Sequence, residues 1–216
     1  MVRALRAVAI TAAFLLLFSI PASADTAALS SVAGGESAQS SSDQLYGWIF
    51  RVDTPIDVTA LGVYDIAGDA GLSVSHDVGI YLQSDESLMG FQTVPSGTVG
   101  TLIDGFRYEN VSPFALAPDT YVIVMTMPTF NVDYQLISSG AFSVSFSTAS
   151  DITYVTSAFD DGSALHFPAP GANGSYAPGI FGPNFTFTSS TVPEPSTYSA
   201  LGLGLAALLA FGRRRA

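Results

Sequence analysis

The 216-residue sequence contains no cysteine and no lysine. The absence of cysteine excludes a disulfide framework, a thiolate metal site and a cysteine nucleophile. All seven basic residues are arginines, and five of them lie near the two ends of the chain. Between Asp25 and Val192, two arginines stand against 17 acidic residues. A body this anionic repels phosphate backbones, so the composition excludes a nucleic-acid partner.

Charged residues are also few, at 12% of the chain, whereas 48% of the residues are hydrophobic. This balance is typical of a chain with a folded core rather than of a disordered one. The length suits one β-sandwich or barrel of ordinary size.

Residues 1–24 have the three parts of a secretory signal peptide. Two arginines form a positive flank, and a mostly apolar run, Ala7–Ile20, follows. Pro21 ends the predicted signal helix, and Ala22 and Ala24 offer the small side chains that a signal peptidase requires. We expect cleavage after Ala24. The alternative, an uncleaved anchor, is disfavoured because the run is shorter than the ~20 residues that a bilayer needs.

A second apolar stretch, Tyr198–Gly212, precedes three arginines that close the chain: Arg213, Arg214 and Arg215. As a helix it spans about 22 Å, less than the ~30 Å hydrocarbon core. This short C-terminal membrane helix therefore enters a bilayer only if the bilayer thins or the arginines snorkel. The arginines stay on the cytoplasmic side, which places the acidic body outside. Both ends of the chain predict the same topology.

Pro193, Glu194 and Pro195 form an extended segment just before this stretch. Together with the short helix and the arginine cluster, residues 192–216 resemble the PEP-CTERM sorting signal of Gram-negative bacteria. The resemblance implies recognition by an exosortase, a membrane-embedded cysteine peptidase-like enzyme, and removal of the tail during export. It makes the three residues a recognition element without chemistry of their own. A permanent C-terminal anchor is the alternative.

The body is predicted to be all-β. Asp25–Asp43 is rich in serine, alanine and glycine, and it is predicted to be a flexible lead-in. Over residues 44–191, short apolar runs alternate with turn residues, which predicts one antiparallel, jelly-roll-like β-sandwich. The expected strands include Val58–Tyr64, Val78–Leu82, Leu88–Val94, Thr98–Ile103, Phe106–Tyr108, Thr120–Thr126, Ile152–Val155 and Asn184–Thr188.

Two irregular features are expected within this body. Gly105 permits a β-bulge between two of the strands. The stretch Phe167–Asn184 holds four glycines and four prolines, and we predict a long surface loop there.

The motifs Gly47–Phe50, Val58–Asp65 and Ser75–Tyr81 lie within a longer stretch, about Leu45–Pro128. This stretch resembles a recurrent module of exosortase substrates whose function is unknown. The resemblance implies a β-sandwich and brings no catalytic residue with it.

A metal site is a weaker hypothesis. Asp65 and Asp69 lie four residues apart in a glycine-containing segment, so both could bind one hard cation such as Ca²⁺. Asp77 adds a third ligand if the segment folds back. The spacing lacks the full EF-hand pattern, and a polar turn in which Asp65 caps backbone amides is favoured. No other cofactor is expected.

Catalytic motifs are scarce. The two histidines are His76 and His166, and the sequence has no Gly-x-Ser-x-Gly elbow. Asp77 follows His76 directly, and neighbours in a strand point to opposite faces, so these two do not form a dyad. We therefore expect no enzyme. A secreted hydrolase built on either histidine is the least favoured alternative.

Four aromatic residues could stack on sugar rings, but their strand spacing favours the core; they are Tyr46, Trp48, Tyr64 and Tyr81. Arg51 and Arg107 are each expected to pair with a nearby acid.

The sequence therefore predicts a non-enzymatic protein that passes the inner membrane and ends at the cell surface or in the extracellular matrix. Its expected partners are signal peptidase, an exosortase, the membrane through the C-terminal helix, and exopolysaccharide or biofilm material. A Ca²⁺-assisted carbohydrate-binding module is the first alternative.

Overall fold

The computed structural model describes residues 24–34, 36–38, 43–65, 71–128, 133, 135–137, 143–168 and 179–190. Within these ranges every regular element is a β-strand. The strands are β1 (Thr26–Ala27), β2 (Leu29–Gly34), β3 (Glu36–Ala38), β4 (Gln44–Val52), β5 (Ile56–Tyr64), β6 (His76–Leu82), β7 (Leu88–Val94), β8 (Thr101–Ile103), β9 (Phe106–Leu116), β10 (Thr120–Met127), β11 (Gln135–Ile137), β12 (Val144–Thr148), β13 (Ile152–Asp161), β14 (Ile180–Phe181) and β15 (Pro183–Ser189).

The predicted signal helix and the predicted C-terminal helix fall outside the described ranges. Inside them, no helix has the length and apolarity to cross a bilayer.

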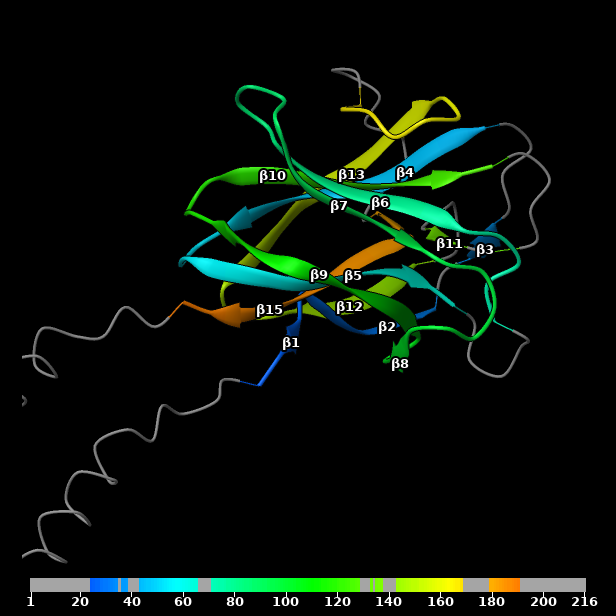
Figure 1. Cartoon of the computed structure of the whole chain (residues 1–216), viewed down its shortest axis with the longest axis horizontal. Coiled ribbons are helices and arrows are strands. Elements are labelled where there is room, and N and C mark those ends of the chain that lie inside the picture. Colours follow the sequence, from blue (N-terminus) through cyan, green and yellow to red (C-terminus); the bar gives the residue numbers. More distant parts are fainter. Residues whose placement is uncertain are drawn as a thin grey trace, which may run out of the picture.

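Two five-stranded sheets form the body (Figure 1). One has the order β1-β15-β5-β9-β8 and the other β13-β4-β10-β6-β7. Two smaller sheets, β14-β11-β3 and β12-β2, accompany them. The named strand pairs are all antiparallel, which confirms the predicted all-β, antiparallel class.

Aromatic side chains join the two large sheets. Trp48 and Phe50 lie on β4, and Phe185 lies on β15 of the other sheet. The Trp48 and Phe185 rings stack with centroids 6.0 Å apart, and those of Phe50 and Phe185 are 4.9 Å apart. The indole Nε1 of Trp48 donates a hydrogen bond to the Pro183 carbonyl at 2.8 Å, so its polar atom is satisfied inside the core. The body is therefore a sandwich with one shared core.

The sheet β13-β4-β10-β6-β7 is also covered on its outer face, away from the other large sheet. Leu45, Ile49, Val122 and Val124 are buried there, and Leu165 packs against them with Phe167. Burial on both faces explains why Tyr121–Met127 of β10 is continuously buried and why β4 does not alternate between apolar and polar residues.

Three sequence-based predictions need correction. The lead-in predicted over Asp25–Asp43 contains β1, β2 and β3, and Leu29 is fully buried in the core. Gly105 does not form a bulge, because Asp104 and Gly105, both at positive φ, make the turn between β8 and β9. The loop predicted over Phe167–Asn184 contains β14 and the start of β15, which are buried.

The two ends of the body lie together. β1 pairs antiparallel with β15, and Thr26, at the start of β1, lies opposite Phe187, near the end of β15 (Figure 1). We call this end of the sandwich the exit end. The opposite end, where β6 and β9 begin, is called the far end.

Candidate functional site

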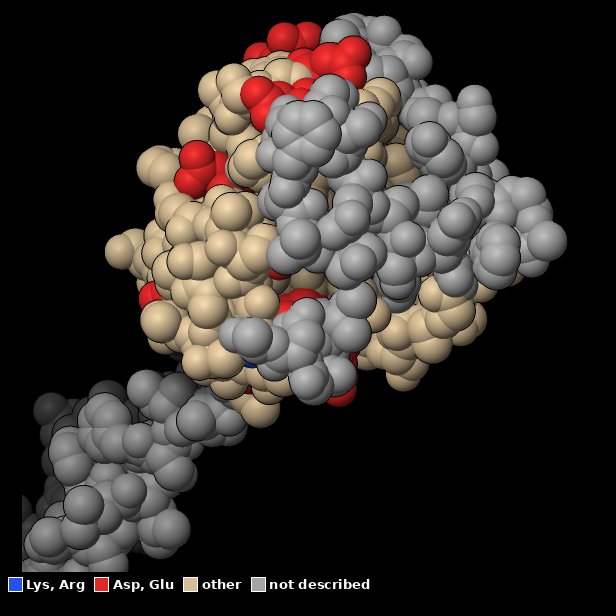
Figure 2. Space-filling view, turned by 90° about the vertical axis from the view of Figure 1, so that its right-hand side faces the viewer, with Lys and Arg blue, Asp and Glu red and all other residues tan. Residues whose placement is uncertain are grey.

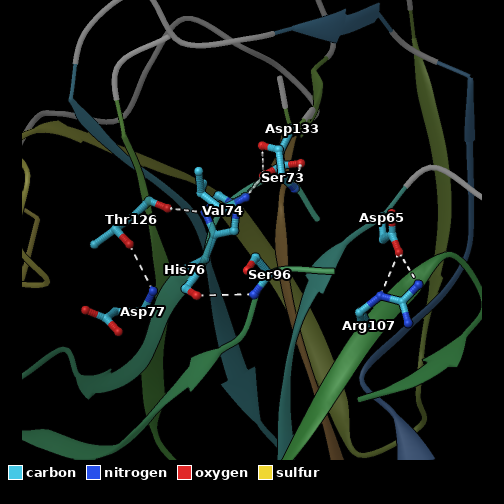
Figure 3. Close-up of polar contacts among 10 residues, drawn as sticks. Asp65, Ser73, Val74, His76, Asp77, Ser96, Arg107, Thr126 and Asp133 are labelled. Carbon is cyan, nitrogen blue, oxygen red and sulfur yellow. Dashed lines mark hydrogen bonds and ion pairs between the residues drawn. The ribbon is translucent and has the colours of Figure 1, made fainter. Parts of the chain in front are cut away.

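A buried polar network at the far end is centred on His76, the first residue of β6 (Figure 3). The ring is fully buried. Its Nδ1 lies 2.7 Å from the carbonyl oxygen of Thr126 on β10, and its Nε2 lies 3.0 Å from Oδ2 of Asp133. Asp133 also accepts hydrogen bonds from the Ser73 amide and hydroxyl, both at 2.7 Å, and from the Val74 amide at 3.2 Å. The network therefore ties the segment before β6 to Asp133.

The hydrogen-bond partners indicate how His76 and Asp133 use their polar atoms. Both nitrogens of His76 face acceptors, and a neutral imidazole carries one N–H and satisfies only one of them. Burial by itself raises the pKa of Asp133, but the hydrogen bonds from His76, Ser73 and Val74 outweigh burial and hold that pKa below its ordinary value. Asp133 is therefore a carboxylate at neutral pH.

Asp77 points away from this network (Figure 3). Its carboxylate accepts a hydrogen bond from the Thr93 hydroxyl at 2.6 Å, and its amide donates to the Thr126 hydroxyl at 2.9 Å. The expectation that His76 and Asp77 do not form a dyad is confirmed. The actual partner of His76, Asp133, is 57 residues away in sequence, and no local motif indicates it.

The second buried pair at the far end joins Asp65, which follows β5, to Arg107 on β9. Nε and Nη2 of Arg107 donate to Oδ2 of Asp65 at 2.8 and 2.5 Å. Nη1 donates to the carbonyls of Thr98 and Gly100 at 3.0 and 3.4 Å. The side chains are 8% and 3% exposed for Arg107 and Asp65, so this arginine holds the loop before β8 against the end of β5.

This arrangement bears on the proposed metal ligands. Asp65 is engaged by Arg107, Asp77 is bonded to Thr93, and Asp69 lies outside the described residues. In the ranges that the structure covers, no three His, Asp or Glu side chains come together as a metal site. The Ca²⁺ hypothesis stays a prediction.

The predicted arginine pairs are confirmed, because Arg51 binds Asp53 at 2.7 Å as Arg107 binds Asp65. His166 lies 3.3 Å from Asp160 and is partly exposed.

The candidate sugar-stacking residues are core residues, as their spacing favoured. Tyr46, Trp48 and Tyr81 are buried. Tyr64 packs partly buried against Phe106, edge to face. None of these four rings forms an exposed platform.

Among the described residues of the face in Figure 2, uncharged residues outnumber acidic ones. Acidic side chains appear there as separate patches, whereas the Arg107 guanidinium is directed inward to Asp65 (Figures 2 and 3).

Most of the predicted export residues fall outside the described ranges: Ala22, Pro193, Glu194, Pro195, Arg213, Arg214 and Arg215. Ala24 is exposed and lies two residues before β1, so the predicted signal-peptidase site immediately precedes the first strand.

Comparison with protein families gives one finding. Residues 191–215 match the family model of the PEP-CTERM protein-sorting motif. The match confirms the sorting signal expected at this end and indicates export with membrane-associated sorting by an exosortase. A search of curated proteins gave no match to this chain.

Proposed function

We propose that this protein is a non-enzymatic component of the cell surface or extracellular matrix, delivered by exosortase-type sorting and associated with exopolysaccharide. The observation that carries the proposal is the sorting motif at residues 191–215, which follows directly on an acidic β-sandwich. The N-terminal signal predicted over 1–24 agrees with it in direction, because both ends place the body outside.

The polar groups of the body support a structural role. His76 uses both ring nitrogens within the fold, and Arg107 uses its guanidinium to fix loops. His166 is the more accessible histidine, so H166A tests the hydrolase alternative without unfolding the body. A hydrolytic activity that is present in the parent and lost in H166A would support that alternative.

Processing is tested on the full chain in a host that carries an exosortase. Intact mass of the recovered protein should show loss of residues 1–24 and of the segment after the Pro-Glu-Pro box. The triple variant P193A/E194A/P195A should remain unprocessed at the membrane. Normal release of this variant would refute exosortase sorting of the chain.

The polymer is tested by pull-down of the processed protein. The net charge of the body repels anionic polymers at low ionic strength, so we expect a neutral polysaccharide to be retained in preference to an anionic one. Retention that is lost with a chelator would instead support the Ca²⁺-assisted binding module. Absence of retention on every polysaccharide of the source matrix would contradict the association.

A further inference from the structure

One flank of the sandwich carries most of the exposed apolar side chains. Residues 87–103, which include β7 and β8, contain no charged side chain, and we call this stretch the uncharged flank. Six large hydrophobic side chains are exposed in the described part of the chain, and five of them lie on this flank: Leu88, Phe91, Val99, Leu102 and Ile103. The sixth, Val155, lies on β13, at the opposite edge of the sheet that contains β7.

β7 and β8 are edge strands of the two large sheets. β7 ends the order β13-β4-β10-β6-β7, and β8 ends the order β1-β15-β5-β9-β8. β7 lies beside β9, the neighbour of β8 (Figure 1). A Cβ on Gly90 would lie 2.4 Å from the Phe114 ring of β9, so β9 closes the inner face of β7. Within the described ranges β7 pairs with β6 alone, and its other edge faces outward.

The other edge strands of the large sheets are protected against further pairing. β1 and β8 have only two and three residues, and β13 ends in Asp160 and Asp161 and changes register after Tyr154. β7 has seven residues without charge or proline, and its register shift lies at its start, next to Leu88. β7 is therefore the edge of the large sheets that is most open to an added strand.

The charge of the body indicates which partner fits this edge. Two arginines stand against 17 acidic residues, so a basic partner is attracted to the acidic surface elsewhere rather than to this flank. A second copy of the chain is equally acidic, and two copies approach most readily where both lack charge. A strand that pairs antiparallel with its own copy is self-complementary about a two-fold axis. Antiparallel pairing also keeps Asp85 and Glu86 of the two copies at opposite ends of the paired strands.

We propose that β7 pairs antiparallel with β7 of a second copy, which joins two sheets into one continuous sheet across a two-fold dimer. Overlap of the whole strand, Leu88–Val94, places the axis at its middle residue, Phe91, so the two Phe91 rings lie opposite each other. Phe91 is 58% exposed, and the residue opposite it on β6 is Gly79, which has no side chain to cover the ring. The inference concerns the folded body and does not depend on the proposed function.

Sedimentation equilibrium of the exported protein over a concentration series measures the dimer. We expect dimerisation to strengthen with ionic strength, because salt screens the repulsion between two acidic bodies. F91D removes both rings and sets two carboxylates opposite each other, so it should weaken dimerisation at least about tenfold. V155D is the matched control, because Val155 is 51% exposed on the edge strand β13 and the substitution adds the same charge. It should dimerise like the parent.

Cysteine crosslinking tests the register. The chain has no cysteine, so a single introduced cysteine forms a disulfide only with another copy. Directly opposite residues of an antiparallel pair have Cβ atoms about 4.5–5.5 Å apart, close to the reach of a disulfide. F91C should therefore crosslink readily. Thr93 lies on the same face, but in this register its counterpart is four residues further along, about 13 Å away, so T93C should crosslink far more slowly, as should V155C.

The outcomes decide the inference. Loss of the dimer in F91D but not in V155D, with F91C crosslinking faster than T93C and V155C, supports the pairing. A parent that stays monomeric at every concentration and ionic strength overturns it, and so does a dimer that F91D and V155D weaken equally. If the parent is monomeric and F91D instead abolishes retention on a polysaccharide, the flank binds the polymer and the dimer is refuted. Denaturant unfolding, followed by the fluorescence of the buried Trp48, verifies that each variant is folded.

Discussion

Replacing Asp133 with asparagine probes the buried network at the far end. The carboxylate accepts from four donors, namely the amide and hydroxyl of Ser73, the amide of Val74 and the ring of His76. Asparagine keeps the shape of the side chain, but it replaces one acceptor oxygen by an NH₂ group that donates. D133N therefore sets donor against donor where the carboxylate oxygen accepted hydrogen bonds.

The expected loss is large for a single substitution. Hydrogen bonds to a charged group contribute about 1.5–3 kcal/mol each, and D133N replaces one of the two acceptor oxygens, so we expect a loss of about 3–5 kcal/mol in the free energy of unfolding. A domain of this size is stable by about 5–15 kcal/mol, so D133N removes about a fifth or more of that stability. The corresponding fall in melting temperature is about 6–20 °C.

Denaturant unfolding of the exported protein measures this loss, with Trp48 as the reporter. It is the one tryptophan of the chain and is fully buried, so its fluorescence reports the core.

The contribution of Asp133 to the free energy of unfolding should depend on pH in a definite direction. Because the pKa of Asp133 is lowered in the folded state, its stabilisation is complete above about pH 4 and is lost as the pH falls through the folded pKa. The difference between parent and D133N should shrink below pH 4.

D77N is the matched control. It removes one carboxylate charge from the same strand, but Asp77 makes a single side-chain bond, to Thr93, outside the core. It should cost less than about 1 kcal/mol. Equal losses in D133N and D77N, or a D133N deficit that is unchanged between pH 7 and pH 3, would refute the view that Asp133 is a buried carboxylate stabilised by its hydrogen bonds.

Three further substitutions test the remaining supports of the fold by the same unfolding measurement. R107M leaves the buried Asp65 carboxylate without its charged partner and should lower the free energy of unfolding by about 3–5 kcal/mol. The double variant D65L/R107M should lose less than the sum of its two single variants, and simple additivity would contradict an interaction between Asp65 and Arg107. N184A removes bonds from a fully buried amide to the Leu29 backbone and the Tyr108 hydroxyl, and it should cost about 3 kcal/mol or more, whereas a loss below about 1 kcal/mol would mean that those groups find other partners. G47A places a Cβ 1.9 Å from the Ile123 carbonyl oxygen and should lower the free energy of unfolding by about 3 kcal/mol or more. In G97A the new Cβ meets no atom within 4 Å, so the loss should be only the ~1–2 kcal/mol caused by the positive φ of that position. A larger loss in G97A than in G47A would contradict the packing of β4 on β10.

Local patterns predicted the strands that bury apolar side chains. The hairpin of β6 and β7 and the buried strand β10 lie close to their expected bounds, because their apolar runs and flanking turn residues act at short range. The turn at Asp104 and Gly105 also carried a readable signal, since Asp-Gly between two apolar runs favours a two-residue hairpin. The bulge interpretation overlooked it.

The strands β2 and β3 were missed for a different reason. Apart from Leu29 and Val32, residues 29–38 are small or polar, so their low β-strand propensity favours a loop. Their pairing partners, β12 and β11, lie about 100 residues away, and pairing over that distance produces no recognisable pattern in the local sequence. Asp133 could not be assigned to His76 for the same reason, because the two residues are 57 positions apart in the sequence. The polar network is a product of tertiary packing, and tertiary packing overrides local preference.

The positions of the chain ends determine which part of the body faces outward during sorting. β1 begins and β15 ends at the exit end, so a chain held by either export segment is held there. In the proposed export orientation the far end lies furthest from the membrane, and it is the end where the His76–Asp133 and Arg107–Asp65 pairs lie. With Arg107 buried and Arg51 paired to Asp53, neither arginine of the body is left to attract an anionic polymer. For the polysaccharide association that we propose, the described part of the body therefore offers hydrogen bonding rather than cations, which suits an uncharged polysaccharide.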